Sequence, residues 1–167
     1  IMPRLVGSEM CIRDSYKKLS STSDMVGKAS FFGKTITGLS DDVRISKRLN
    51  IPSYRLRGFQ KGKVGPVENN DYIGGNHITS ANLSATLPNI VEGLDNLDVG
   101  IFVDAANVWG VDYDSSIDDK STIRSSAGVA LNLMTPIGPL SFSFASALTK
   151  ASSDKTETFR FNLGTQF

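Results

Sequence analysis

The stretch Glu157-Thr-Phe-Arg-Phe-Asn-Leu-Gly-Thr-Gln-Phe167 decides the fold, because its apolar and polar side chains alternate. Phe159, Phe161, Leu163 and Phe167 fall on one face, and Arg, Asn, Gly and Gln fall on the other. A two-residue period is typical of a β-strand, whose successive side chains point to opposite faces of a sheet. The stretch therefore predicts a strand with one apolar and one polar face.

Two upstream stretches show the same period. Leu140–Leu148 puts Leu and Phe on one face and only Ser or Ala on the other, and Ile123–Leu133 places Arg, Ser, Gly and Asn opposite its apolar face. We predict an all-β chain with about six antiparallel strands. The remaining strands are expected at about Met25–Thr37, Ile73–Leu87 and Asp98–Trp109, with Tyr16–Ser20 as the stump of another.

The connections between these strands alternate in length. Pro136–Pro139 is a tight turn and Pro88–Asn96 a turn region, whereas Lys150–Thr156 is polar and loose and Gly110–Ser121 is rich in Asp and Ser. Short turns at one end and longer loops at the other are typical of outer-membrane barrels.

A soluble β-sandwich also alternates, and periodicity alone favours it because sandwiches are common. Two features favour a membrane barrel instead. The last stretch stops on an aromatic residue without a polar tail, and its apolar face carries no charge although its opposite face could meet water. No run approaches the roughly 18 apolar residues that a membrane-spanning helix needs, so insertion into a membrane would require a barrel.

The first residues differ from the rest of the chain. Residues 1–15 show neither strand alternation nor a helical period, and Glu9–Ser15 resembles a translated sequencing adapter. We therefore interpret residues 1–15 as non-native and residues 16–167 as the C-terminal part of a barrel.

The composition of the remaining chain excludes several functions. Without Arg4, Glu9, Arg13 and Asp14, the 18 basic and 17 acidic residues fall to 16 and 15, and the single cysteine, Cys11, is lost as well. A nearly neutral chain lacks the basic stripe that nucleic-acid binding needs. A chain without thiols has no disulfide, no thiolate metal site and no cysteine nucleophile.

Five motifs, in order, resemble the BamA family of outer-membrane assembly barrels and cover most of residues 25–167. Leu56-Arg-Gly-Phe59, followed by Gly65-Pro66, resembles the tip of the family's sixth outer loop, which folds back into the barrel. Phe102–Trp109 resembles the Asp-containing motif of a later strand. The other matches are Gly74–Asn76 at a strand start, Arg124–Leu131 with Thr135–Phe144 as the penultimate hairpin, and Phe159–Phe167 as the terminal signal strand.

The resemblance implies the C-terminal part of a transmembrane antiparallel β-barrel in the bacterial outer membrane, with about six of the family's 16 strands. It implies a non-enzymatic function, the assembly and insertion of β-barrel proteins. The implied partners are the lipid bilayer, unfolded β-barrel substrates and periplasmic accessory lipoproteins, with no nucleic acid, cofactor or metal. The main alternative is a related secretion barrel or a porin that transports a polypeptide or solutes, and a soluble sandwich enzyme is a third.

The first candidate site that follows from the resemblance is a loop lock, formed by Arg57, Gly58, Phe59 and Asp104. Arg57 would reach from the loop into the barrel and pair with Asp104, because a guanidinium fork fits a carboxylate in two parallel bonds. Gly58 would allow a close backbone approach, and Phe59 would pack on the wall. The alternative is a solvated Arg57 and an Asp104 bonded to water.

Two residues depart from the family pattern near this lock. Ser84 stands where the family often has an acidic residue, and Ala106 stands where it often has Gly. One possible partner of the loop arginine is therefore missing, and Asp104, which shares its strand face with Ala106, is the partner that remains.

The second candidate site is a terminal seam, formed by Phe159, Phe161, Leu163, Gly164 and Phe167. In a whole barrel the last strand closes against the first, and the family implies that this weak seam opens sideways and templates incoming strands. The alternative is a lipid-facing surface with an aromatic girdle.

No catalytic residue is predicted. His77 is the only histidine and has no nucleophile motif around it, so a role as a base is the weaker interpretation. Asp112–Asp119 is acidic but lacks the spacing of a calcium-binding EF-hand loop, and we interpret it as a hydrated outer loop. Trp109 is expected to anchor at the membrane interface.

Overall fold

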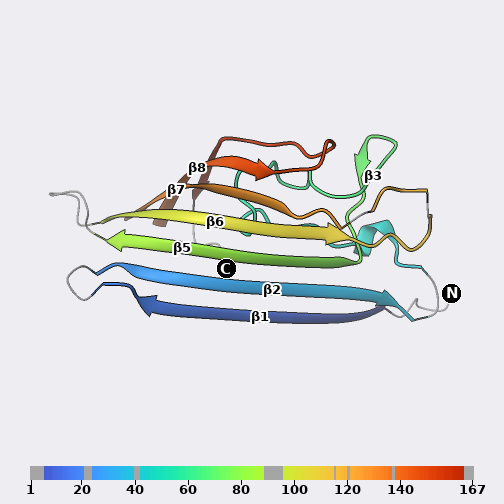
Figure 1. The fold of residues 1–167 in the computed structure, drawn as a ribbon, viewed down its shortest axis with the longest axis horizontal. Helices are drawn as coiled ribbons and strands as arrows, with labels where there is room; N and C mark the ends of the chain where they lie inside the picture. The colour runs from blue at the N-terminus through green and yellow to red at the C-terminus, as the bar shows by residue number, and fades with distance from the viewer. Residues whose placement is uncertain are drawn as a thin grey trace.

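The structure, a computed structural model, describes residues 6–20, 24–39, 42–88, 96–114, 116–119, 121–136 and 138–163. One sheet of seven antiparallel strands runs in the order β1-β2-β5-β6-β7-β8-β9 (Figure 1). The strands are β1 (Val6–Lys18), β2 (Val26–Gly38), β5 (His77–Pro88), β6 (Leu97–Trp109), β7 (Arg124–Thr135), β8 (Gly138–Thr149) and β9 (Phe159–Leu163).

The segment between β2 and β5 contains the remaining short elements. These are a single 3₁₀ turn, η1 (Ile45–Lys47), and a two-stranded hairpin of β3 (Val67–Glu68) and β4 (Asp71–Tyr72). None of the helices in the described residues is long and apolar enough to cross a membrane.

The predicted all-β antiparallel architecture is confirmed, although the sheet has seven strands and not about six. Strand β5 begins at His77 and not at Ile73. The cause is the pair Gly74 and Gly75. Gly75 forms an antiparallel bridge with Leu49, and Gly74 adopts φ +71°, a conformation that favours glycine. The chain is therefore tied to the preceding segment before it joins the sheet.

The two faces of the sheet differ as the alternation predicts. From β2 onward, the described strand residues on the outer face include no Asp, Glu, Lys or Arg. Large apolar side chains on this face are exposed, as expected for a surface that meets lipid. They include Phe31, Leu83, Ile101, Val103, Val129, Phe144 and Leu148.

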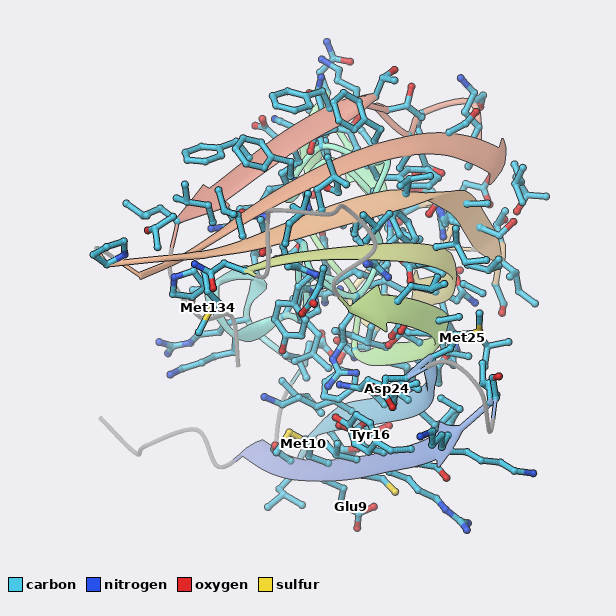
Figure 2. All side chains as sticks on the ribbon, turned by 90° about the vertical axis from the view of Figure 1, so that its left-hand side faces the viewer. Glu9, Met10, Tyr16, Asp24, Met25 and Met134 are labelled. Atoms are coloured by element: carbon cyan, nitrogen blue, oxygen red, sulfur yellow. The ribbon has the colours of Figure 1, made fainter. Side chains whose placement is uncertain are left out.

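Strand β1 departs from this pattern. It pairs with β2 from Val6↔Gly38 to Lys18↔Val26, so the predicted stump at Tyr16–Ser20 is one end of a longer strand. Its outer face carries three charges, at Glu9, Arg13 and Lys17. Figure 2 shows Glu9 pointing away from the molecule, while Met10 and Tyr16 lie on the side that faces it. The interpretation of residues 1–15 as non-native stays a prediction.

The segment 42–76 packs against the inner face of the sheet. Its buried residues contact inner-face residues of β2, β5 and β6 in one hydrophobic cluster. The cluster therefore consists of loop and wall in similar parts, and burial of this apolar surface holds the loop in place. Its members are Phe32, Ile36, Val43, Leu49, Ile51, Leu56, Phe59, Val64, Ile78, Ala106 and Val108.

Candidate functional site

The structure brings Arg57 and Asp104 together on the inner face of the sheet. The Arg57 Nε donates to Asp104 Oδ2 at 2.7 Å, and Nη2 donates to Oδ1 at 2.8 Å. The backbone N–H of Arg57 adds a third bond to Oδ2 at 3.1 Å. Two parallel charge-assisted bonds with a backbone donor fix both the position and the direction of the loop tip.

Asp104 occupies a site built by two neighbouring strands. It lies in the middle of β6 and is fully buried, and it stands opposite Asn82 of β5. The Asn82 Nδ2 donates both to Asp104 Oδ1, at 2.9 Å, and to the Arg55 carbonyl, at 2.7 Å. The guanidinium of Arg57 lies over the Phe102 ring, 3.4 Å from its centroid, which adds a cation–π contact.

The two departures from the family pattern have different outcomes. Ser84 lines an open hollow and has no role in the ion pair. Asn82, one inner-face position away, supplies the extra contact to Asp104, and sequence analysis missed it because an amide is not the acidic residue that the pattern suggests. Ala106 is 3% exposed and packs in the hydrophobic cluster under the loop.

Gly58 and Phe59 lie where the loop touches the wall. Gly58 has φ +87°, and a Cβ there would come 3.1 Å from Ala145 Cβ and 3.3 Å from Ser126 Cβ. Phe59 is 1% exposed and forms a backbone bridge with Thr156. The next amide, at Gln60, donates to the Lys155 carbonyl at 2.9 Å. The loop tip therefore rests directly on β7, β8 and the β8–β9 connection.

A second ion pair, which sequence analysis did not predict, joins Arg124 and Asp154. The Arg124 Nε donates to Asp154 Oδ2 at 2.9 Å and Nη2 donates to Oδ1 at 3.2 Å, with both side chains buried. Asp154 also accepts from the backbone N–H of Gly65, in the long loop, at 3.3 Å. The connection Lys150–Thr156, expected to be loose, is therefore fastened to both β7 and the loop.

A third ion pair ties the start of the long loop to the β6–β7 connection. The Arg48 Nη2 donates to Asp112 Oδ1 at 2.5 Å, and the Val43 amide donates to Asp112 Oδ2 at 2.9 Å. Burial raises the pKa of Asp112, but the Val43 amide, the Asn76 side chain and the Arg48 charge together lower that pKa below its ordinary value. The acidic connection is therefore more than a hydrated loop, because Asp112 anchors the segment.

The residues of the terminal seam are only partly described. Phe159, Phe161 and Leu163 lie on the outer face of β9 and are about half exposed, whereas Gly164 and Phe167 lie outside the described residues. Phe161 contacts Phe142 at 5.2 Å between ring centroids, and Phe159 contacts Phe144 at 5.0 Å. The outer aromatic side chains of β9 therefore pack along those of β8.

The inner face holds an open hollow of about 690 Å³ beside the loop, which contributes residues 53–55 and 57 to its lining. Polar and charged side chains line most of it, among them Ser84, Asn132, Ser141, Arg160 and Asn162. Such a lining suits a surface in contact with water.

His77, at the start of β5, contacts both neighbouring strands. His77 packs against Trp109 at 5.5 Å between ring centroids, and its Nδ1 lies 3.2 Å from Thr35 Oγ1. Within the described ranges, no three His, Cys, Asp or Glu residues lie close enough together to hold a metal ion.

Comparison with known proteins identifies the family. The model of the Omp85 superfamily domain matches residues 12–167. The outer membrane protein assembly factor BamA of Neisseria meningitidis is 33% identical over 67% of this chain and 17% of its own length, and BamA of Neorickettsia risticii is 30% identical over 67% and 16%. The chain thus spans about a sixth of the curated relatives it matches.

A solved structure agrees with these sequence matches. BamA from Haemophilus ducreyi, lacking POTRA domains 1–3, superposes with a TM-score of 0.82 and 28% sequence identity, over 92% of this chain and 34% of that one. The open seven-stranded sheet described above therefore corresponds to part of a closed barrel. The chain belongs to the Omp85 superfamily, and its strands are part of a bacterial outer-membrane β-barrel.

Proposed function

We infer that the protein containing this chain assembles and inserts other β-barrel proteins in the outer membrane. Its barrel wall carries a loop fastened inside by the loop lock, and its terminal strand forms one side of a weak seam at which a substrate strand can add. Unfolded β-barrel proteins are the proposed substrates, and periplasmic lipoproteins are the proposed accessory partners. No covalent bond is made or broken, so the proposal requires no catalytic residue.

The observation that carries the proposal is that the segment 42–76 is fastened to the inner face. An open lumen would favour a passive pore. Here the loop instead covers one half of the inner face with buried apolar side chains. Arg57 and Asp104 then fix that loop at its tip through two parallel bonds. A plug that is held by an ion pair with a fully buried carboxylate suits a barrel that must keep its shape while a substrate strand adds at its edge.

The test is assembly of an unfolded outer-membrane barrel by the intact protein in lipid vesicles, followed by protease protection of the product. We expect Asp104→Asn to reduce the initial rate of assembly at least about tenfold, because one lost charge-assisted pair of bonds corresponds to about 1.5–3 kcal/mol. Ser84→Ala, on the same inner face but outside the lock, is the matched control and should keep the wild-type rate.

Conductance of the same vesicles separates this proposal from a transport barrel. The proposal predicts assembly with little steady conductance. Steady conductance without any assembly of substrate would contradict it and favour a porin or a secretion barrel.

A further inference from the structure

The strand β9 and the loop tip are joined by the side chain of Arg160, which neither candidate site includes. Arg160 lies on the inner face of β9, opposite Ser143 of β8, and its side chain is 12% exposed. Its Nη1 donates to the Ser53 carbonyl and its Nη2 donates to the Phe59 carbonyl, each at 2.5 Å. Its Nε donates to Glu157 Oε1 at 2.5 Å.

These bonds hold the backbone of the loop on both sides of Arg57. Ser53 and Phe59 flank Arg57, whose own guanidinium points to Asp104 of β6. The loop tip is therefore held by two guanidinium groups. Its own Arg57 binds Asp104 in the middle of β6, and Arg160 of β9 binds the backbone of the loop. A rigid guanidinium can bridge two carbonyls in this way, whereas an ammonium group cannot present the same fork.

Backbone bonds support the same connection. The amide of Glu157 donates to the Gly58 carbonyl at 3.1 Å, and Gln60 donates to Lys155. Among the described strands, β9 pairs with β8. The inner face of β9 adds to this pairing a second set of contacts, and these contacts are with the loop.

We propose that Arg160 is a positioning residue that couples the loop lock to the terminal strand. Displacement of β9 removes the Arg160 bonds from the loop tip, and release of the loop tip removes the acceptors of Arg160 from β9. Loop docking and order in β9 therefore favour each other, and by linkage the effect is equal in both directions. The coupling itself does not depend on the proposed function. Only a role of this coupling in the opening of the seam rests on that function.

Hydrogen exchange of the intact protein in lipid nanodiscs tests the coupling. In Arg160→Gln we expect the amides of residues 53–60 to exchange at least about tenfold faster, because each bond from a charged donor contributes about that factor. In Asp104→Asn, altered on a different strand, we expect the amides of residues 157–163 to exchange faster as well. Arg44→Gln, the same change at an exposed arginine of the same loop, is the matched control and should leave both segments unchanged.

Exchange confined to β9 in Arg160→Gln, or an unchanged β9 in Asp104→Asn, would overturn the coupling. If Arg160→Gln does not fold, Arg160→Lys replaces it, because lysine keeps the charge without the planar guanidinium. We expect faster exchange in both segments of Arg160→Lys, by a smaller factor. Unchanged exchange in that variant would also overturn the coupling. Assembly is measured in parallel. Coupled exchange with an unaltered assembly rate keeps the inference and contradicts the proposed function, whereas slower assembly without coupled exchange contradicts only the inference.

Discussion

The inner face of this sheet has two halves that differ in chemistry. In the half that the long loop covers, the wall presents apolar side chains such as Ile36, Ile78 and Val108, all less than a tenth exposed. In the other half, β5, β7 and β8 present Ser84, Asn132 and Ser141 to an open hollow. One continuous sheet thus acts as a hydrophobic core at one end and as a hydrated surface at the other, and the difference is set by how far the loop reaches.

The Arg57–Asp104 pair stands close to the border between these halves. Arg57 lines the hollow with part of its side chain, while Asp104 is fully buried behind it. Desolvation of a carboxylate is costly unless it is paired and hydrogen-bonded, and Asp104 receives donors from Arg57 and Asn82. Loss of a single hydrogen bond is therefore expected to lower the free energy of unfolding most at this border.

The largest contrast between the halves is expected from truncation of a loop side chain. Phe59→Ala should lower the free energy of unfolding of the intact barrel by about 4 kcal/mol, because a fully buried aromatic side chain leaves a cavity. Ser84→Ala in the hollow half should change it by less than about 0.5 kcal/mol. Denaturant titration in lipid vesicles measures both, and equal losses would mean that the loop does not form a core.

A smaller effect is expected from Gly58→Ala, which sharpens the comparison by adding a single methyl group where loop and wall meet. Strain at positive φ together with contacts at 3.1 Å and 3.3 Å should cost about 2–3 kcal/mol. Gly62→Ala is the matched control, since Gly62 also has positive φ but a Cβ there meets nothing within 4 Å. It should cost only about 1–2 kcal/mol, and a loss as large as that of Gly58→Ala would rule out steric contact with the wall.

The smallest effect concerns pH at the outer rim of the covered half. The pKa of Asp112 is lowered in the folded protein, so its contribution to stability is present above the ordinary carboxyl pKa and is lost as pH falls through the lowered value. Hydrogen exchange of the amide of Val43, whose acceptor is Asp112 Oδ2, should therefore accelerate in that acidic range. In Asp112→Asn this acid-dependent step should disappear, and its persistence would assign the step to another group.

From β2 onward, sequence analysis predicted the strands and the outer face well, because lipid contact requires an uncharged side chain at every second position. It missed most of β1, whose outer face carries three charges. It was less complete for the inner face of the covered half. There Ala105-Ala106-Asn107-Val108 no longer alternates, since loop packing makes inner positions apolar as well. The extent of the covered half depends on contacts between residues far apart in the sequence, which periodicity does not report.

The candidate site shows the same limit. Arg57 and Asp104 could be paired from a motif and from strand parity, because Asp104 shares its face with Ala106. Asn82 and Arg160 could not, since their importance comes from the strand register that sets Asn82 opposite Asp104 and from backbone carbonyls, which carry no sequence signal. The Arg124–Asp154 pair was missed because a polar loop was expected to be solvated.

The measurement that tests the loop lock most directly is a double-mutant cycle of Arg57→Ala and Asp104→Ala in the intact barrel, with the free energy of unfolding determined in lipid vesicles. Each single change should cost about 3–5 kcal/mol. Arg57→Ala leaves the fully buried Asp104 carboxylate without its ion pair, and Asp104→Ala removes the acceptor of both Arg57 and Asn82. The double variant should then lose about 2–3 kcal/mol less than the sum of the two single losses. Additive losses, within about 0.5 kcal/mol, would contradict the account, since they would mean that the two residues act independently.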